Sequence, residues 1–208
     1  MVTSAAFDMS PEQRVSTVFQ LLQDAGKKEY MGGETSLLDH ALITAELAKD
    51  GGADEETILA ALLLNIGRLF PPIEQGSAID NEKFKYRLTG ATGISPPLNY
   101  HRLGADYLRQ LEFSQKTCDL IELQDLAIRT TPVHIPTYLM PDHDVIQINT
   151  TGRPSLTPNE LEQFQNAPYF EETVQVMLWG CAAKTTEIKP ASLDSYREMA
   201  IRNLKLDN

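Results

Sequence analysis

The segment from Asp54 to Leu69 predicts a helix that is buried on every side. Between Ile58 and Leu64 all seven residues are apolar, whereas a helix at a protein surface keeps a polar stripe. Asp54 suits the start of such a helix, and Pro71 and Pro72 end it. The apolar run is far shorter than the roughly 20 residues that cross a bilayer. The segment is therefore expected to lie at the centre of a helical bundle.

Helix signals recur along most of the chain. Ser10-Pro11-Glu12-Gln13 and Thr157-Pro158-Asn159-Glu160 both combine a capping side chain, a proline at the first helical position and a reciprocal cap. Besides the Asp54–Leu69 segment, apolar spacing and stop signals predict further helices. These cover residues 11–26, 36–50, 99–111, 115–129, 158–165, 169–185 and 193–206.

The resulting fold class is all-α, a helical bundle in a single domain over residues 1–208, with residues 1–28 forming an N-terminal helical segment. No alternation typical of strands is sustained. Residues 73–97 and 130–156 contain several glycines and prolines and no helical period, so they are expected to form long irregular connections.

The charge of the chain excludes two classes of partner, and its cysteine content indicates the cellular compartment. The chain has 29 acidic and 18 basic residues, a net charge of −11. This charge repels nucleic acids and anionic membranes, so neither is expected as a partner. Cys118 and Cys181 lie far apart and predict no disulfide framework, and the first nine residues show no signal-peptide pattern. We expect a cytoplasmic protein; the sequence leaves its oligomeric state open.

Four motifs, in this order, resemble one known family. The first begins Tyr30-x-Gly-Gly-Glu34 and continues through His40 to Ala45; the others are His101-Arg-Leu-Gly-Ala-Asp-Tyr-Leu, Gly152-Arg-Pro-Ser-Leu-Thr-Pro and Trp179-Gly-Cys-Ala-Ala-Lys184. Together they are similar to the HD-domain oxygenases that cleave organophosphonates, mixed-valent di-iron enzymes related to myo-inositol oxygenase. The resemblance runs from about Tyr30 to Tyr196 and implies an HD-domain fold.

Carried onto this chain, the resemblance also implies that most metal ligands are missing. Ligand histidines are retained at His40 and His101. The His-Asp pair of the family falls on Leu64 and Asn65, a further ligand histidine falls on Gln124, and the terminal ligand aspartate falls on Gly180. Leu64 and Gly180 have no side-chain donor, and a neutral amide does not offset the charge of two cations. We therefore predict no metal and no cofactor.

Neutral polar groups remain at the positions of the missing ligands. We predict that His40, His101, Asn65 and Gln124 line the former metal cavity and carry acid–base and hydrogen-bonding chemistry there. A buried amide without partners costs about 1–3 kcal/mol, so Asn65 is expected to bond His40 or a ligand. The structural alternative is that His40 is only a hydrogen-bonded core histidine.

Five further residues are candidates for substrate binding on the same resemblance. Tyr30 and Glu34 belong to the glycine-bearing loop, and Leu64 lines the cavity. Lys184 and Arg129 could each bind an anion, or could simply be surface side chains with a buried stem.

Two functions from different classes follow. The first is a metal-independent, redox-neutral enzyme of isomerase, cyclase or lyase type that acts on a small organic molecule, as in a specialised biosynthetic pathway. The second is a non-catalytic HD-fold protein that binds a small molecule or a protein partner. A third possibility retains one metal ion on His40, His101 and a carboxylate from the connections.

Overall fold

The computed structural model describes residues 9–26, 35–70, 79–81, 84–86, 100–130, 134–135 and 155–204. The predicted ligand-binding residues Tyr30 and Glu34 lie outside these ranges, as does most of the connection predicted over 130–156.

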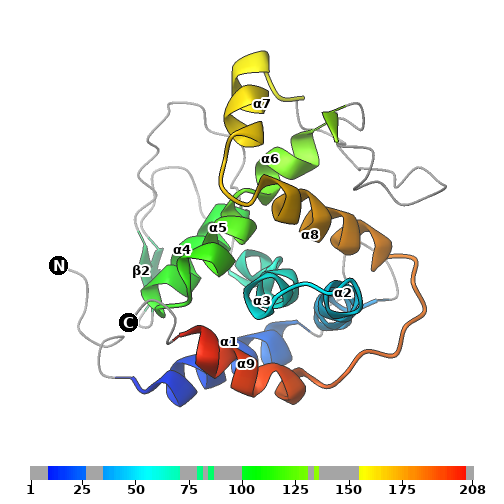
Figure 1. Ribbon diagram of the computed structural model, residues 1–208. Helices are drawn as coiled ribbons and strands as arrows, with labels where there is room; N and C mark the ends of the chain where they lie inside the picture. Colours follow the sequence, from blue (N-terminus) through cyan, green and yellow to red (C-terminus); the bar gives the residue numbers. More distant parts are fainter. Residues whose placement is uncertain are drawn as a thin grey trace.

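The described part of the chain is predominantly helical, which confirms the all-α prediction and is consistent with an HD-like bundle (Figure 1). The α-helices are α1 (Pro11–Ala25), α2 (Leu37–Asp50), α3 (Glu55–Leu63), α4 (Tyr100–Gln110), α5 (Gln115–Glu122), α6 (Gln124–Arg129), α7 (Pro158–Gln165), α8 (Phe170–Ala182) and α9 (Arg197–Asn203). Two short 3-10 helices are η1 (Ile66–Leu69) and η4 (Leu193–Tyr196).

Helix α3 is the centre of the bundle, as its apolar sequence predicts. Every residue from Thr57 to Leu63 is buried. Helices α2, α5, α8 and α9 contact it from different sides (Figure 1). The all-round apolar sequence is therefore explained by packing against several neighbours at once.

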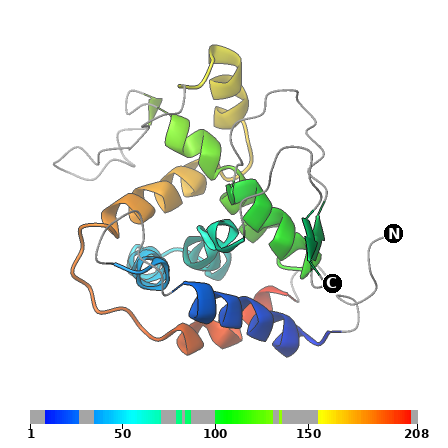
Figure 2. The same cartoon turned by 180° about the vertical axis from the view of Figure 1, so that it is seen from behind.

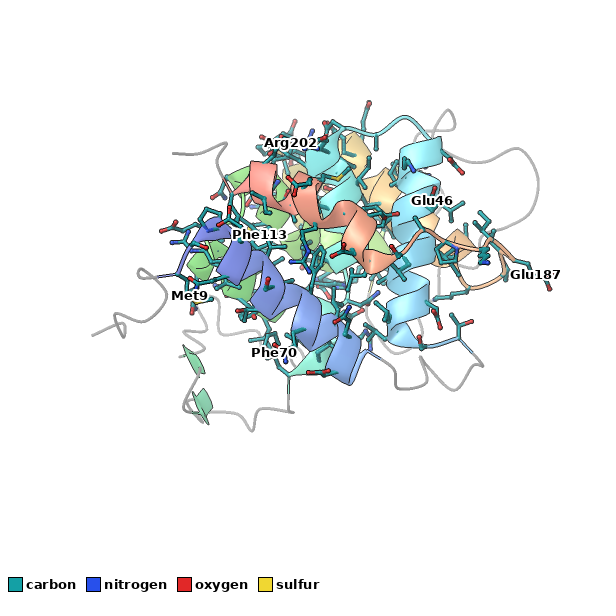
Figure 3. The ribbon with its side chains drawn as sticks, turned by 90° about the horizontal axis from the view of Figure 1, so that it is seen from below. Met9, Glu46, Phe70, Phe113, Glu187 and Arg202 are labelled. Atoms are coloured by element: carbon teal, nitrogen blue, oxygen red, sulfur yellow. The ribbon has the colours of Figure 1, made fainter. Side chains whose placement is uncertain are left out.

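Helices α1 and α9 lie together across one face of the bundle (Figure 3). The start of α1 has the predicted capping box. The Ser10 hydroxyl accepts from the Gln13 backbone N–H, and the Gln13 side-chain oxygen accepts from the Ser10 backbone N–H. The end of α9 is tied inward by Asn203, whose amide bonds Ser114 and Thr117 at the start of α5. These polar contacts fix the angle of α9 against the core.

A smaller apolar cluster joins α6, α7 and α8 on the opposite side of the bundle (Figure 2). Phe164 of α7 is fully buried there and meets Phe170 at an edge-to-face ring distance of 4.9 Å. Thr157 and Glu160 form the second predicted capping box at the start of α7. This cluster holds α6 against α8, which matters for the site described below.

The prediction of one continuous helix from Asp54 to Leu69 is wrong at its end. Helix α3 stops at Leu63, and Asn65 has φ −104° and ψ 11° before η1 begins. The break accompanies a very close crossing of η1 and α4. A Cβ on Gly67 would collide with the Tyr100 carbonyl oxygen, and a Cβ on Gly104 would lie 2.9 Å from Ile66. Tertiary packing of backbone on backbone therefore overrides the local helical pattern.

Three other element boundaries also differ from the sequence prediction. The predicted helix over 115–129 breaks at Leu123 into α5 and α6, and the last helix is a 3-10 turn followed by α9. Within the connection expected to be irregular, β1 (Ile79–Asn81) and β2 (Phe84–Tyr86) form a short antiparallel hairpin. The hairpin adds no layer to the bundle.

Candidate functional site

His40 links helix α2 to the last turn of helix α8. Its Nε2 lies 2.9 Å from the Gly180 carbonyl oxygen, and only 1% of the residue is exposed. The last carbonyls of a helix lack the usual partner four residues ahead, and here the Lys184 N–H bonds the Cys181 carbonyl instead. His40 therefore caps α8 from inside the bundle.

This contact fixes the protonation of the His40 ring. A carbonyl oxygen can only accept, so Nε2 carries the hydrogen and Nδ1 carries the lone pair. Burial lowers the pKa of His40 to about 4; the charges of Lys184 and Arg68 act in the same direction, and the bond to Gly180 opposes them. His40 is consequently neutral near pH 7, in one tautomer.

Leu64 and Gly180 face each other beside His40. A Cβ built on Gly180 would lie 3.1 Å from Leu64 Cδ2, closer than an ordinary contact between carbon atoms. Leu64 is buried and the side of α8 that it meets carries no side chain. The leucine and the glycine therefore complement each other in size, at two positions where the family resemblance implies metal ligands.

The Asn65 side chain accepts a hydrogen bond from Arg68. Arg68 Nε donates to Asn65 Oδ1 at 3.1 Å, and the Arg68 guanidinium lies 3.7 Å from the centre of the Tyr100 ring. Asn65 itself is buried, whereas Arg68 is exposed. An exposed guanidinium is thus held by an amide oxygen and an aromatic face on the His40 side of the bundle.

His101 lies in the first turn of α4, directly after Tyr100. Its ring centre is 4.0 Å from that of Tyr100, and only 1% of the residue is exposed. The Tyr100 ring therefore contacts both the His101 ring and the Arg68 guanidinium. Neither Tyr100 nor Arg68 is among the site residues predicted from the sequence; the available signal is an arginine three residues after an asparagine in an apolar run.

Gln124 connects the α5–α6 junction to helix α8. The residue is fully buried, and its Nε2 donates to the carbonyls of Leu120 at 3.2 Å and Thr173 at 2.9 Å. Thr173 and Gly180 are seven residues apart on α8, which is about two helical turns, so they share one face of that helix. His40 and Gln124 therefore attach to the same face of α8.

The predicted substrate-binding residues fall in different environments. Leu64 lies in the buried site, and Lys184 is exposed just beyond α8, close enough for its charge to lower the pKa of His40. Arg129 pairs with Glu160 at 2.9 Å and Asp125 at 3.6 Å, so it fastens α7 to α6. The role of Arg129 in binding a substrate anion stays a prediction.

The described residues contain no group of three His, Cys, Asp or Glu side chains close enough to hold a metal ion. Cys181 is partly buried, and burial raises the pKa of its thiol, as expected for a packing residue rather than a nucleophile. Within the same ranges, no helix has the length and apolar character needed to cross a membrane.

No protein-family model matches the chain. Among curated proteins, an uncharacterised protein, L432, of Acanthamoeba polyphaga mimivirus is 27% identical over 201 residues, which cover 92% of this chain and 82% of the viral protein. Hydroxymethylphosphonate dioxygenase from Gimesia maris is 26% identical over 204 residues, which cover 90% of this chain and 86% of that enzyme. The second match supports a distant relationship between this chain and the HD-domain oxygenases.

Proposed function

We propose that this chain is a metal-independent enzyme that performs redox-neutral chemistry, of isomerase, cyclase or lyase type, on a small organic molecule. The proposed site lies among α2, the α3–η1 turn, α4, α6 and α8. The proposal includes a cytoplasmic location and a place in a specialised biosynthetic pathway. It does not include nucleic acid or membrane as a partner.

The residues at the implied ligand positions do not fit a di-metal centre. Leu64 and Gly180 provide no donor atom, and a carboxylate side chain at position 180 would have to displace Leu64. The Asn65 oxygen accepts from Arg68, and His40 Nε2 donates to a carbonyl. His40 Nδ1 keeps its lone pair, but the neutral amides at positions 65 and 124 do not offset the charge of two cations. We therefore derive no step that involves a metal.

The observation that carries the proposal is the fixed, neutral state of His40. Its Nε2–H is held by Gly180, so its Nδ1 lone pair has a set direction before any substrate arrives. A pKa of about 4 makes the ring a weak base. His40 therefore serves as a preorganised acceptor that orients and polarises a substrate O–H or N–H, while another group takes the proton.

The remaining site residues have complementary roles in this proposal. His101 is assigned the proton transfer, because it is the second imidazole of the site. Asn65, whose Oδ1 accepts from Arg68, is assigned the orientation of the substrate. Arg68 and Lys184 place positive charge on the same side as His40, which favours a substrate with an anionic group.

Conversion of an identified substrate tests the proposal. A small-molecule extract of the cells that produce the protein is incubated with it. Mass spectrometry then searches for products whose mass equals that of a consumed compound or differs from it by one water. We expect conversion that is insensitive to chelators and is strongly reduced by His40→Gln, which keeps a donor for Gly180 but alters the acceptor. The exposed His134 provides the control His134→Gln, which should retain full turnover.

Unchanged turnover in both His40→Gln and His101→Ala would remove the assigned roles. Loss of turnover on chelation, with recovery on adding iron, would replace the proposal by the metal-dependent alternative.

A second candidate function is a non-catalytic protein that binds a small molecule or a protein partner. It is favoured by the structural contacts of the same residues, since His40 caps α8, Gln124 joins α5 to α8 and Leu64 packs on Gly180. Under this alternative, ligand binding measured by calorimetry persists without any product, and His40→Gln lowers thermal stability without altering a reaction.

A further inference from the structure

The orientation of the Gln124 amide is determined by its two hydrogen-bond partners. Both are backbone carbonyls, of Leu120 and Thr173, and carbonyls only accept. The group that faces them must be the NH₂, and its two hydrogens are both used. Gln124 therefore has no hydrogen left to donate, and its remaining capacity is that of an acceptor at Oε1.

Gln124 Oε1 is a buried acceptor to which no group donates within the described part of the protein. The residue has no exposed surface, so bulk water does not compensate. Turning the Gln124 amide by 180° would place Oε1 against the two carbonyl oxygens, which repel it, and would leave both N–H groups without these acceptors. Buried acceptors in this state are rare in folded proteins and call for a specific partner.

We infer that Gln124 Oε1 is a specificity-determining acceptor for an O–H or N–H group of the bound small molecule. The inference rests on the proposed function, because it requires a guest among these helices. It names a chemical class: the guest presents a neutral hydrogen-bond donor at the α6 end of the site.

The location of Gln124 suits a bound small molecule that extends to the region of His40. Both residues attach to one face of α8, at Thr173 and Gly180, roughly 10 Å apart along the helix axis. His40 Nδ1 is likewise an acceptor. A guest in this site therefore meets acceptors from the protein at both positions. Because Gln124 is enclosed, the side chains around it must separate before the guest arrives.

Two matched pairs of small probes test the inference without knowledge of the substrate. Propan-2-ol and acetone have the same heavy-atom skeleton, but only the alcohol donates; ethanol and acetonitrile, with three heavy atoms each, form a smaller pair. Each is titrated into the isotope-labelled full chain, and the Gln124 side-chain amide resonance is followed by NMR. Gln124→Met identifies that resonance by its loss. Crystals soaked in each probe locate the bound molecules.

We expect the alcohols, and not acetone or acetonitrile, to shift the Gln124 resonance and to place an oxygen about 2.6–3.0 Å from Oε1. Gln124→Met should abolish alcohol binding at this point. Gln115→Met provides the control, because Gln115 lies exposed on α5 and bonds Asp119. It should leave alcohol binding unchanged.

Three results would overturn the inference: equal responses to both members of a pair, no response to either alcohol, or a water molecule on Oε1 that neither alcohol displaces. All three leave the turnover tests of His40 and His101 untouched. A failure of this inference is therefore distinguishable from a failure of the proposed function.

Discussion

Acidification should destabilise this fold through His40, and the size of the effect follows from its pKa. The ring titrates near 6.5 in an unfolded chain and near 4 in the bundle. Between these values the unfolded state binds more protons, so stability rises with pH. The contribution is fully present above about pH 6.5 and is lost as pH falls toward about 4. At about 1.4 kcal/mol for each pKa unit, the full loss is about 3 kcal/mol.

Urea denaturation of the wild type and His40→Gln at several pH values between about 7 and 4 measures this contribution. Glutamine does not titrate and can still donate to Gly180, while carboxylates respond equally in both proteins. The wild type should lose about 2 kcal/mol more than the variant between about pH 7 and 5. The control variant His134→Gln should follow the wild type. Parallel pH dependence of wild type and His40→Gln would refute the reasoning.

Other variants give independent predictions. Gly180→Ala should be more favourable, by about 1 kcal/mol in the free energy of unfolding, in a Leu64→Ala background than in the wild type, because its new Cβ crowds Leu64 only in the wild type; additive effects in the double variant would contradict the contact. Asn203→Ala removes three buried hydrogen bonds and should cost about 2–3 kcal/mol in urea denaturation; a loss below about 0.5 kcal/mol would contradict this. Glu112 has φ 62° and pairs with Arg14. Both Glu112→Gly and Glu112→Ala lose this ion pair, but glycine adopts the left-handed conformation at a free-energy cost about 1 kcal/mol lower than alanine. Glu112→Gly should therefore have the higher melting temperature; equal melting temperatures would contradict the backbone argument.

Local signals were sufficient for most helix starts. Ser10 and Thr157 were identified as caps because a capping box needs only four consecutive residues, and both boxes form as predicted. The central position of α3 followed from its all-round apolar sequence. These features depend on short stretches of chain, which is why the sequence is enough to predict them.

Helix interruptions could not be predicted because distant residues cause them. The break after Leu63 goes with the crossing of Gly67 and Gly104, which are far apart in sequence. The break at Leu123 goes with the attachment of Gln124 to Thr173 on α8. Neither partner is visible from the local pattern, which favours an uninterrupted helix in both places.

The sequence pointed to residues that lie in contact, but their roles in a site stay a prediction. His40 bonds the Gly180 carbonyl, and Leu64 lies against Gly180. The hydrogen-bond directions were not predictable, because they depend on which backbone carbonyl each side chain reaches. Asn65 was expected to bond His40 or a ligand, yet the side chain seen bonded to its oxygen is Arg68, three residues on.

The central claim is that this site works without a metal ion, and metal content tests it most directly. The full chain is purified without chelators, incubated with iron(II), manganese(II) or zinc(II), desalted and measured by plasma mass spectrometry. A paired variant, Leu64→His with Gly180→Asp, shows whether restored donors can capture an ion. We predict far less than one ion per chain for the wild type; near-stoichiometric iron, manganese or zinc would contradict the claim.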